Sequence, residues 1–525
     1  MDSINRRTFI KGVGLTAGLL GVAGMAGCAT SNTLSDTGDD NDSGNAPSEE
    51  YPVSDTLNCD IVVVGGGISG LSAAVEGAQQ GASVILIEKQ AEIGGNSLGA
   101  EGPFAVNSPL QQEANVDLSL YEALKNELQF SNYRANSQVW INYLKQSGDN
   151  IAWLLENGVK FVDVRPCNAG LTGWHYYDGG GKAAVAAMEN SAKEAGVQIM
   201  TSTPMVQLIA EDGRVTGVIA ESDGSYIAIK GKGVVLASGG TGANTATLSE
   251  RTGFDCSNAT INCNPGNTGD GMDAAVGLGA ATRSACIMGD KCVYGYGMFD
   301  HISFAATRQP ILWVNGYGER FVDEGIVRED VPSTFNAVFI SQDACYTIMD
   351  QGTVDSFAQG GAPDSFANYM PGQGANLTQL QQQIDEALSG TIGNVFKGDT
   401  LDELAAAMGF EAATLNETVT RYNELCDKGV DEDFFKKAEF MIPLKTGPFY
   451  GFKMDPLVVC AIGGLCTDIE NHVLDENNEP IAGLYAVGLD GCNLYEETYN
   501  MYLGGSANGY CIYSGRNAAR SILSA

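Results

Sequence analysis

The chain is poor in the residues that build metal and haem centres. Its 525 residues include three histidines and thirteen cysteines, and no two cysteines stand in a CxxC pair. Zinc sites, iron–sulfur clusters and covalently attached c-type haem usually rest on such closely spaced ligands, so the sequence predicts none of them. We expect most of the cysteines to be buried free thiols.

Positive charge is also scarce. The 29 Lys and Arg residues face 64 Asp and Glu residues, which gives a formal net charge of −35 at pH 7. Proteins bind nucleic acid largely by neutralising its phosphates with Lys and Arg, so nucleic acid is not an expected partner. The length is too great for a single hydrophobic core and predicts two or three structural units.

Long apolar runs are missing beyond residue 28, so no membrane-spanning helix is expected there. Before it, Arg6-Arg7 precedes a short run rich in glycine and alanine. This pattern is typical of a twin-arginine export signal, with a membrane anchor as the less fitting alternative. The run ends at Cys28 in a sequence like a bacterial lipobox, which predicts lipidation of this cysteine. We therefore expect a signal peptide at 1–27, a flexible polar tether at 28–56, and a folded protein held by lipid at the outer face of the cytoplasmic membrane.

The most informative segment of the chain is 60–74. Four apolar residues lead into Gly-Gly-Gly-Ile-Ser-Gly at 65–70, and a helix of small residues follows. A buried parallel strand, a tight turn and a helix N-terminus form the geometry that accepts a dinucleotide pyrophosphate. In this reading Gly65 permits the turn, Gly67 lets the backbone approach the phosphates, and Gly70 lets the helix pack on the strand.

A second predicted strand supports this assignment. The apolar run 82–87 ends in Glu88, at the distance from the glycines where a carboxylate binds a ribose hydroxyl. A glycine-rich turn in another kind of α/β protein is the alternative, but strand, glycines, helix and acid all agree.

Segments farther along resemble, in the same order, the flavoprotein family of fumarate reductase and succinate dehydrogenase. They lie at 93–97, 100–102, 197–199, 233–240, 268–271, 483–490 and 503–508. The resemblance implies bound FAD, and a non-covalent mode of binding because no histidine lies near Asn96. The positions that match the family's FAD contacts are Gly65, Gly67, Ser69, Gly70, Glu88, Lys89, Asn96, Ser97, Gly102, Val206, Ala237, Gly239, Gly240, Asp270, Asp490, Ser506 and Ala507.

The resemblance also implies the domain organisation. We expect an α/β fold in which a Rossmann-like FAD-binding domain of the glutathione reductase type is interrupted by an α+β capping domain. The FAD-binding parts would cover 57–280 and 444–525, and the cap 281–443. Within the cap, the sequence predicts helices at 379–388, 401–408 and 415–425 and a surface loop at 359–373.

The segment 313–324 resembles the family's strand-turn-strand element that lines the active site. Four residues later, Arg328 matches the family's proton-donating arginine. The resemblance implies that flavin N5 delivers hydride to a double bond while Arg328 delivers the proton. Arginine has a reference pKa above about 12, so it acts as an acid only when it is desolvated and resupplied with protons. The alternative is a surface arginine paired with Glu329.

Three departures from the family bear on the substrate. Tyr502 stands where dicarboxylate reductases carry a carboxylate-clamping arginine, and Cys460 replaces a histidine in the segment that contains Gly464. A phenol hydrogen-bonds or stacks, but it cannot form a bidentate ion pair, so fumarate is not the expected substrate. The family's relay positions hold Phe304 and Thr307, and Arg308 is the neighbouring residue that can substitute.

Histidines and aromatic residues complete the candidate substrate site. His301 lies near a family substrate histidine, and His175 lies in an aromatic segment; a structural role is the alternative for each. The aromatic candidates, part of which are expected in the core, are Trp174, Tyr176, Tyr294, Tyr296, Trp313, Tyr499 and Tyr502. If several line the pocket, a bulky aryl or polycyclic enone or acrylate fits it better than a small dicarboxylate.

The expected function is therefore an FAD-dependent reductase of an activated carbon–carbon double bond. Its partners would be a small unsaturated organic substrate and an external electron donor, such as a membrane-linked cytochrome or a quinol-dependent protein. Two alternatives remain. One is a dehydrogenase of the 3-ketosteroid desaturase type, and the other is a non-catalytic flavoprotein that relays electrons or binds a ligand.

Overall fold

A six-stranded sheet carries the predicted dinucleotide-binding motif. The strand order is β18 (His472–Leu474), β19 (Pro480–Ala486), β10 (Gly233–Leu236), β2 (Ile61–Val64), β3 (Val84–Ile87) and β6 (Gln198–Met200). β19, β10, β2, β3 and β6 pair in parallel, whereas β18 is antiparallel to β19. Every residue of β2, β3 and β10 is buried, because helices or other strands cover both faces of a parallel sheet; this explains their unbroken apolar runs.

This computed structural model describes residues 51–167, 170–328, 331–363, 376–390, 393–495 and 499–525. The predicted signal peptide, the lipidation site Cys28 and most of the predicted tether lie outside the described residues. Within the described part, no helix combines the length and apolarity that crossing a bilayer requires.

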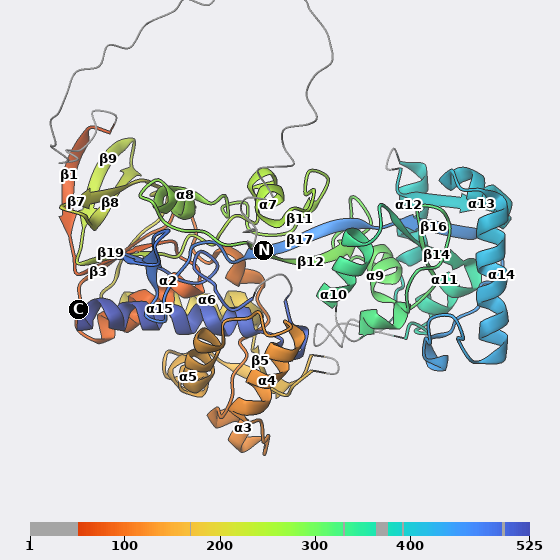
Figure 1. The fold of residues 1–525 in the computed structure, drawn as a ribbon, viewed down its shortest axis with the longest axis horizontal. Coiled ribbons are helices and arrows are strands. Elements are labelled where there is room, and N and C mark those ends of the chain that lie inside the picture. The colour runs from red at the N-terminus through yellow and green to blue at the C-terminus, as the bar shows by residue number, and fades with distance from the viewer. Residues whose placement is uncertain (1–50, 168–169, 329–330, 364–375, 391–392, 496–498) are drawn as a thin grey trace, which may run out of the picture. The chain divides into compact units, whose positions relative to one another are not determined.

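Two long helices pack together beside this sheet (Figure 1). α2 (Ile68–Gln79) starts directly after Gly67, and α15 (Ser506–Ser524) ends the chain. The two backbones approach so closely that a Cβ on Gly515 would lie 2.2 Å from the carbonyl oxygen of Ser69. Glu76 of α2 joins them further by accepting hydrogen bonds from Arg516 at 2.6 Å and Arg520 at 2.7 Å.

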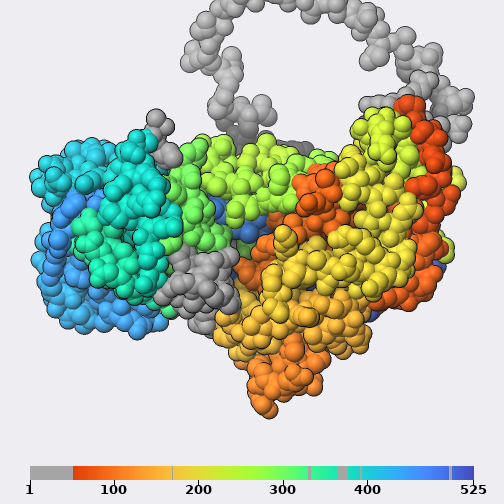
Figure 2. Space-filling model, turned by 180° about the vertical axis from the view of Figure 1, so that it is seen from behind, coloured from red at the N-terminus to blue at the C-terminus, as the bar shows by residue number. Residues whose placement is uncertain are grey.

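A second sheet of four strands corrects the predicted start of the fold. Its order is β1 (Val53–Asn58), β9 (Ser225–Lys230), β8 (Arg214–Ser222) and β7 (Met205–Glu211); Figures 1 and 2 show β1 in red beside these strands. The tether was predicted to reach residue 56, but the strand already begins at Val53. Most side chains of β1 are exposed, so no apolar pattern marks it, and its parallel pairing with β9 orders it instead.

The chain then builds two further sheets. β12 (Cys286–Cys292) is antiparallel to β17 (Asp455–Ile462), which also pairs with β11 (Thr260–Ile261). A four-stranded sheet follows in the order β13 (Trp313–Asn315), β14 (Cys345–Asp350), β16 (Phe449–Lys453) and β15 (Val395–Gly398). The predicted cap boundaries stay predictions. The strand pairing itself continues across residue 443, since β16 and β17 lie beyond it.

Helices surround this last sheet (Figure 1). They are α9 (His301–Arg308), α11 (Gln351–Ala358), α12 (Leu380–Ser389), α13 (Leu401–Met408) and α14 (Ala412–Lys428). The helices predicted at 379–388, 401–408 and 415–425 are confirmed as α12, α13 and part of α14. Most of the predicted loop at 359–373 lies outside the described residues.

The remaining elements are short or flank the main sheet. They are α3 (Pro109–Glu113), α4 (Leu120–Phe130), α5 (Ser137–Glu156), β4 (Phe161–Arg165), β5 (Trp174–Tyr177), α6 (Gly180–Glu194), α7 (Thr245–Thr252), α8 (Asp270–Val276), α10 (Val331–Phe335), a π-helical turn η3 (Asn336–Ile340), and the 3-10 turns η1 (Gly95–Gly99), η2 (Glu324–Arg328), η5 (Ala438–Phe440) and η6 (Met501–Leu503).

Candidate active site

A cavity of about 630 Å³ opens at the carboxyl ends of β2, β3 and β10. The residues that follow these strands, including Gly65, Glu88 and Ala237, form part of its wall. Parallel α/β sheets bind their ligands at this edge, because the loops there leave a crevice. This volume lies within the range of ligand-binding pockets.

The predicted FAD contacts converge on this wall. The ones that line the cavity are Gly65, Gly67, Ser69, Glu88, Lys89, Asn96, Ser97, Gly102, Ala237, Gly239, Asp270 and Ala507. The backbone is shaped for close approach. Gly65 has φ +112°, and a Cβ there would lie 2.2 Å from the carbonyl oxygen of Ala237. These residues therefore fit the adenine dinucleotide portion of FAD.

Glu88 is held where the prediction requires it. Its Oε2 accepts a hydrogen bond from the Gly66 amide at 2.7 Å, and its Oε1 accepts one from the Gln90 amide at 2.9 Å. A carboxylate can accept about four hydrogen bonds in all, so both oxygens keep capacity for ribose hydroxyls.

Five predicted cofactor residues do not line the cavity. Gly70 packs against the turn, since a Cβ there would lie 2.0 Å from the carbonyl oxygen of Gly65. Asp490 is fully buried and accepts hydrogen bonds from the hydroxyl of Ser238 at 2.9 Å and the amide of Gly240 at 2.8 Å. Burial raises the pKa of Asp490, although these donors oppose the shift. It therefore anchors the loop after β10.

Gly240 is the third of these five, and its amide is the donor to Asp490 named above. The last two are Val206 and Ser506. Val206 follows Met205, which does line the cavity, and the hydroxyl of Ser506 is hydrogen-bonded to that of Tyr495. The cofactor roles of all five stay predictions.

The remaining wall is rich in aromatic rings and sulfur. It includes Trp174, Tyr176, Phe299, Tyr499, Cys167, Cys263, Cys460, Met288, Met298 and Met501. Flat apolar faces and polarisable thioethers suit an aromatic ligand. Of the predicted aromatic candidates, Trp174, Tyr176 and Tyr499 line the cavity. Trp313 is fully buried in a separate apolar cluster, and Tyr294, Tyr296 and Tyr502 do not line the cavity.

One buried ion pair lies on this wall. Arg308, the last residue of α9, donates from Nη2 to Oδ2 of Asp290 near the end of β12. The two residues are 5% and 2% exposed, respectively. The ring of Phe299 lies below the guanidinium, 5.6 Å from Cζ to the ring centroid. Arg308, which was expected to substitute in the family's relay, is thus a wall residue.

Glu101 adds a carboxyl group to the same wall. Burial raises its pKa above the ordinary value, and the positive charge of Arg308 opposes part of that shift. A carboxyl group with a raised pKa holds its proton to a higher pH than an exposed one and can act as an acid.

Arg328 is not among the residues that line the cavity. In the 3-10 turn η2, its Nη1 donates to the carbonyl oxygen of Pro363 at 2.6 Å. Its guanidinium lies over the ring of Phe440, 5.6 Å from the centroid. The proton-donor role implied by the resemblance stays a prediction for a residue outside the cavity wall.

The four predicted substrate contacts also lie off the wall. His175 is fully buried; its Nε2 is 2.6 Å from the Ser108 hydroxyl, and its Nδ1 donates to the carbonyl of Gly173 at 2.8 Å. Burial lowers the pKa of His175 to about 4, so it is neutral at pH 7. This histidine joins backbone segments, which agrees with its structural alternative.

The other three are Tyr502, His301 and Gly464. The carbonyl of Tyr502 accepts a hydrogen bond from the Leu171 amide, and Nδ1 of His301 accepts one from the Gln379 amide. Gly464 is packed so tightly that a Cβ would lie 2.6 Å from the side chain of Met272. Their substrate roles stay predictions.

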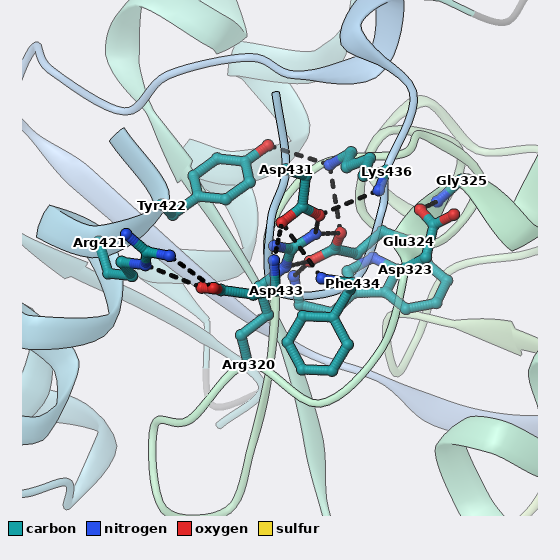
Figure 3. Close-up of polar contacts among 11 residues, drawn as sticks. Arg320, Asp323, Glu324, Gly325, Arg421, Tyr422, Asp431, Asp433, Phe434 and Lys436 are labelled. Carbon is teal, nitrogen blue, oxygen red and sulfur yellow. Dashed lines mark hydrogen bonds and ion pairs between the residues drawn. The ribbon is translucent and has the colours of Figure 1, made fainter. Parts of the chain in front are cut away.

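A second buried ionic cluster fixes the segment that leads to Arg328 (Figure 3). Glu324 begins η2, and Asp431 lies in the loop after α14; both accept hydrogen bonds from Arg320 at 2.8 Å. Lys436 completes the cluster, with its Nζ 3.3 Å from Glu324. We call these four residues the closed cluster. Its side chains hold two distant segments together and do not line the cavity.

Sequence reasoning missed Asp290, Glu101, Phe299 and the methionines as wall residues. Asp290 did leave a signal: the pair Asp-Lys stands within the otherwise uncharged segment 284–293, and buried charges are rare unless they are paired or functional. The others carry no local signal, because the wall assembles from distant segments.

Comparison with known proteins agrees with these observations. A family profile described as FAD binding domain matches residues 60–505. A vinyl phenol reductase of Lactiplantibacillus plantarum is 37% identical over 474 residues, which cover 88% of this chain and 95% of the relative. A fumarate reductase (cytochrome) of Shewanella frigidimarina is 26% identical over 442 residues, covering 82% of this chain and 71% of the relative.

Solved structures share the fold. A 3-ketosteroid delta1-dehydrogenase from Sterolibacterium denitrificans, with a bound steroid, superposes with a TM-score of 0.70 at 20% identity, covering 89% of this chain and 99% of that one. A flavocytochrome c3 fumarate reductase in an open conformation gives 0.66 at 24% identity, covering 90% and 79%.

Proposed function

The chain belongs to the FAD-dependent fumarate reductase/succinate dehydrogenase flavoprotein family, and we propose that it reduces a carbon–carbon double bond conjugated to an aromatic ring. Its membership makes it an FAD-dependent oxidoreductase of CH–CH bonds with an α/β fold, as the sequence predicted. The aromatic substrate, the electron donor and the cellular location are the proposed parts.

The composition of the substrate-side wall carries the proposal. Aromatic rings and thioethers offer dispersion contacts to a flat apolar body. Among the described wall residues the cations are Lys89 and Arg308, and each is already paired with a carboxylate. A dicarboxylate would bring two further negative charges next to the carboxylate of Asp290, and like charges in a buried site repel strongly.

The relatives support an aryl-conjugated substrate. The vinyl phenol reductase has a name that states such a substrate and is 37% identical to this chain. Relatives named NADH:acrylate oxidoreductase, from Vibrio harveyi, and urocanate reductase, from Eggerthella lenta, are 26% and 25% identical. All of these named substrates have a conjugated double bond. The aromatic residues of the cavity wall favour, among them, a substrate whose double bond is conjugated to an aromatic ring.

Bound FAD supplies two-electron hydride chemistry at this site. The chain's own residues then have three tasks. Trp174, Tyr176 and Tyr499 hold the ring and exclude water, the pair Asp290–Arg308 fixes the polar end of the wall, and a nearby acid supplies the proton. The candidate acids are Arg328, from the family resemblance, and Glu101, from its place on the wall.

We also propose that the enzyme acts outside the cytoplasm. Arg6-Arg7 and the lipobox-like sequence at Cys28 support folded export by the twin-arginine route and lipid anchoring. A membrane-linked cytochrome or a quinol-dependent protein would then supply the electrons. Replacing both arginines by lysine should leave the protein in the cytoplasmic fraction; unchanged recovery in the membrane fraction would contradict export by this route.

Anaerobic turnover with reduced methyl viologen tests the proposed reaction. We expect 4-vinylphenol to be reduced with a kcat/KM at least about 100-fold above that of fumarate, because unmatched buried charges penalise the dicarboxylate. Fumarate as the better substrate would overturn the proposal.

The same protein should be tested in the oxidative direction. A 3-oxosteroid 1-dehydrogenase of Mycolicibacterium smegmatis is 28% identical over 388 residues, which cover 67% of this chain and 63% of the relative. Faster oxidation of a 3-ketosteroid with a dye acceptor than reduction of 4-vinylphenol would favour the dehydrogenase alternative. Absence of both activities in FAD-loaded protein would favour a non-catalytic flavoprotein.

A further inference from the structure

We propose that Asp290 binds a phenolic hydroxyl of the substrate and thereby selects aromatic alkenes that carry a free hydroxyl on the ring. This inference rests on the proposed function, because it names the polar group that distinguishes the substrate from other aryl alkenes.

The position of Asp290 is fixed by its strand. β12 pairs with β17, where Asp290 lies opposite Leu457, and the register shifts between Met288 and Gly289. A Cβ on Gly289 would lie 2.5 Å from the ring of Phe335, so this point of the strand admits little change. Met288, Gly289 and Asp290 all line the cavity. The strand therefore holds Asp290 in the cavity wall at a point that admits little change.

One oxygen of Asp290 lacks the hydrogen bonds that burial demands. Oδ2 accepts from Arg308, but Oδ1 has no hydrogen-bond partner among the described residues. The ammonium of Lys291 lies 3.6 Å from Oδ1 and donates instead to the hydroxyl of Thr334. A buried carboxylate oxygen without a donor is costly, so a ligand that donates to Oδ1 gains affinity by meeting that demand.

The charges around Asp290 favour a neutral donor. Arg308 and Lys291 already form ion pairs with its carboxylate, so a further cation is not required. A ligand carboxylate would face Asp290 with the same sign of charge. A hydroxyl group donates one hydrogen bond without bringing a charge.

The neighbours of the pair indicate what bears this hydroxyl. The ring of Phe299 and the sulfur of Met298 both lie against the guanidinium of Arg308, the sulfur at 4.0 Å from Nη2. Both side chains also line the cavity. A hydroxyl group at the edge of an aromatic ring can approach the Asp290 carboxylate from the cavity while the ring contacts these apolar groups. A hydroxyl on a flexible chain would leave them uncovered.

Binding to the oxidised, FAD-loaded protein tests the inference without turnover. The probes are 4-ethylphenol and 4-ethyltoluene, in which a methyl group of about the same size replaces the hydroxyl and cannot donate, and the readout is the change in the flavin absorption spectrum. We expect wild-type protein to bind the phenol at least about tenfold more tightly, since an unmet buried acceptor is penalised. Equal affinities would overturn the role of Asp290 and need no variant.

A double variant then tests whether Asp290 causes the preference for the phenol. Asp290→Leu with Arg308→Met removes both charges of the pair together, so neither partner stays buried without the other. We expect the two probes to bind it with equal affinity, to within about twofold. Retention of the full preference in this variant would overturn the inference. Tyr502→Phe is the matched control: it removes the phenol hydroxyl that the sequence predicted to contact the substrate. This variant should keep the preference for 4-ethylphenol, and loss of the preference in it would transfer the role to Tyr502.

Failure of the inference is distinguishable from failure of the proposed function. If both probes bind equally and 4-vinylphenol is still reduced, the aryl-alkene reductase stands without a phenol site at Asp290. If neither probe perturbs the spectrum while fumarate does, the proposed function itself fails.

Discussion

Two buried ionic groups of this protein contrast in how completely the chain satisfies their carboxylate oxygens. In the closed cluster, Arg320 and the amide of Trp313 donate to one oxygen of Glu324, and Arg320 with Lys436 contacts the other. In the pair Asp290–Arg308, one carboxylate oxygen has a hydrogen bond and the other has none among the described residues.

The number of carboxylate oxygens that have hydrogen-bond partners distinguishes carboxylates that stabilise the fold from carboxylates that can bind a ligand. Asp431 in the closed cluster is satisfied like Glu324: its oxygens accept from Arg320 and from the backbone amides of residues 433, 434 and 436. Carboxylates whose oxygens all have partners stabilise the fold and offer no acceptor to a ligand. A buried carboxylate with an unused acceptor, on a cavity wall, keeps that acceptor for a ligand.

Glu324→Gln should give the largest effect of the substitutions predicted here, because it removes the central carboxylate of the closed cluster. The substitution leaves Arg320 and Lys436 without their shared carboxylate, so we expect the free energy of unfolding to fall by about 3–5 kcal/mol. Urea unfolding monitored by circular dichroism measures it. Glu189→Gln is the matched control: it breaks an exposed pair with Lys193 and should cost less than about 1 kcal/mol. Equal losses would show that the closed cluster contributes no special stability.

Glu101→Gln tests whether the cavity side supplies the proton. Glu101 lies on the wall and Arg328 does not, so we expect Glu101→Gln to lower kcat about 100-fold with FAD still bound. Arg328→Lys should change kcat much less. Steady-state assays with reduced viologen measure both variants, and flavin absorbance checks cofactor content. The opposite ranking would return the proton-donor role to Arg328.

The stability of the protein at low pH tests the role of Asp431 in the closed cluster, and the expected effect is smaller. Burial tends to raise the pKa of Asp431, but hydrogen bonds from Arg320 and backbone amides outweigh it and lower the pKa to about 2. Because the folded pKa lies below the unfolded value of about 3.9, ionised Asp431 stabilises the fold fully above that value. Its contribution, about 2 kcal/mol, is lost as the pH falls from 4 to 2. The wild-type urea midpoint should therefore fall more steeply over this range than that of Asp431→Asn; parallel curves would contradict the assignment.

The cofactor half of the cavity could be predicted from sequence because local backbone geometry defines it. Gly65 has a positive φ and stands against Ala237, and a glycine of this kind, followed by a helix and an acid at Glu88, leaves a readable pattern. The α/β fold follows from the same strands, whose burial on both faces produces apolar runs.

The substrate half could not be predicted in the same way, because contacts between distant segments determine it. Arg328 sits at the position implied by the resemblance, yet its direction depends on Pro363 and Phe440. His175 looks like a ligand-binding residue in sequence, but Ser108 and Gly173 occupy both of its nitrogens. No local pattern reveals such partners.

The most direct test of the central claim is a single anaerobic turnover. The protein is reduced chemically and mixed with one equivalent of 4-vinylphenol, and the flavin absorbance and the organic product are followed together. Our account predicts that the oxidised flavin spectrum returns while an equal amount of 4-ethylphenol forms. A spectrum that stays reduced with 4-vinylphenol, but becomes oxidised with fumarate, would contradict it.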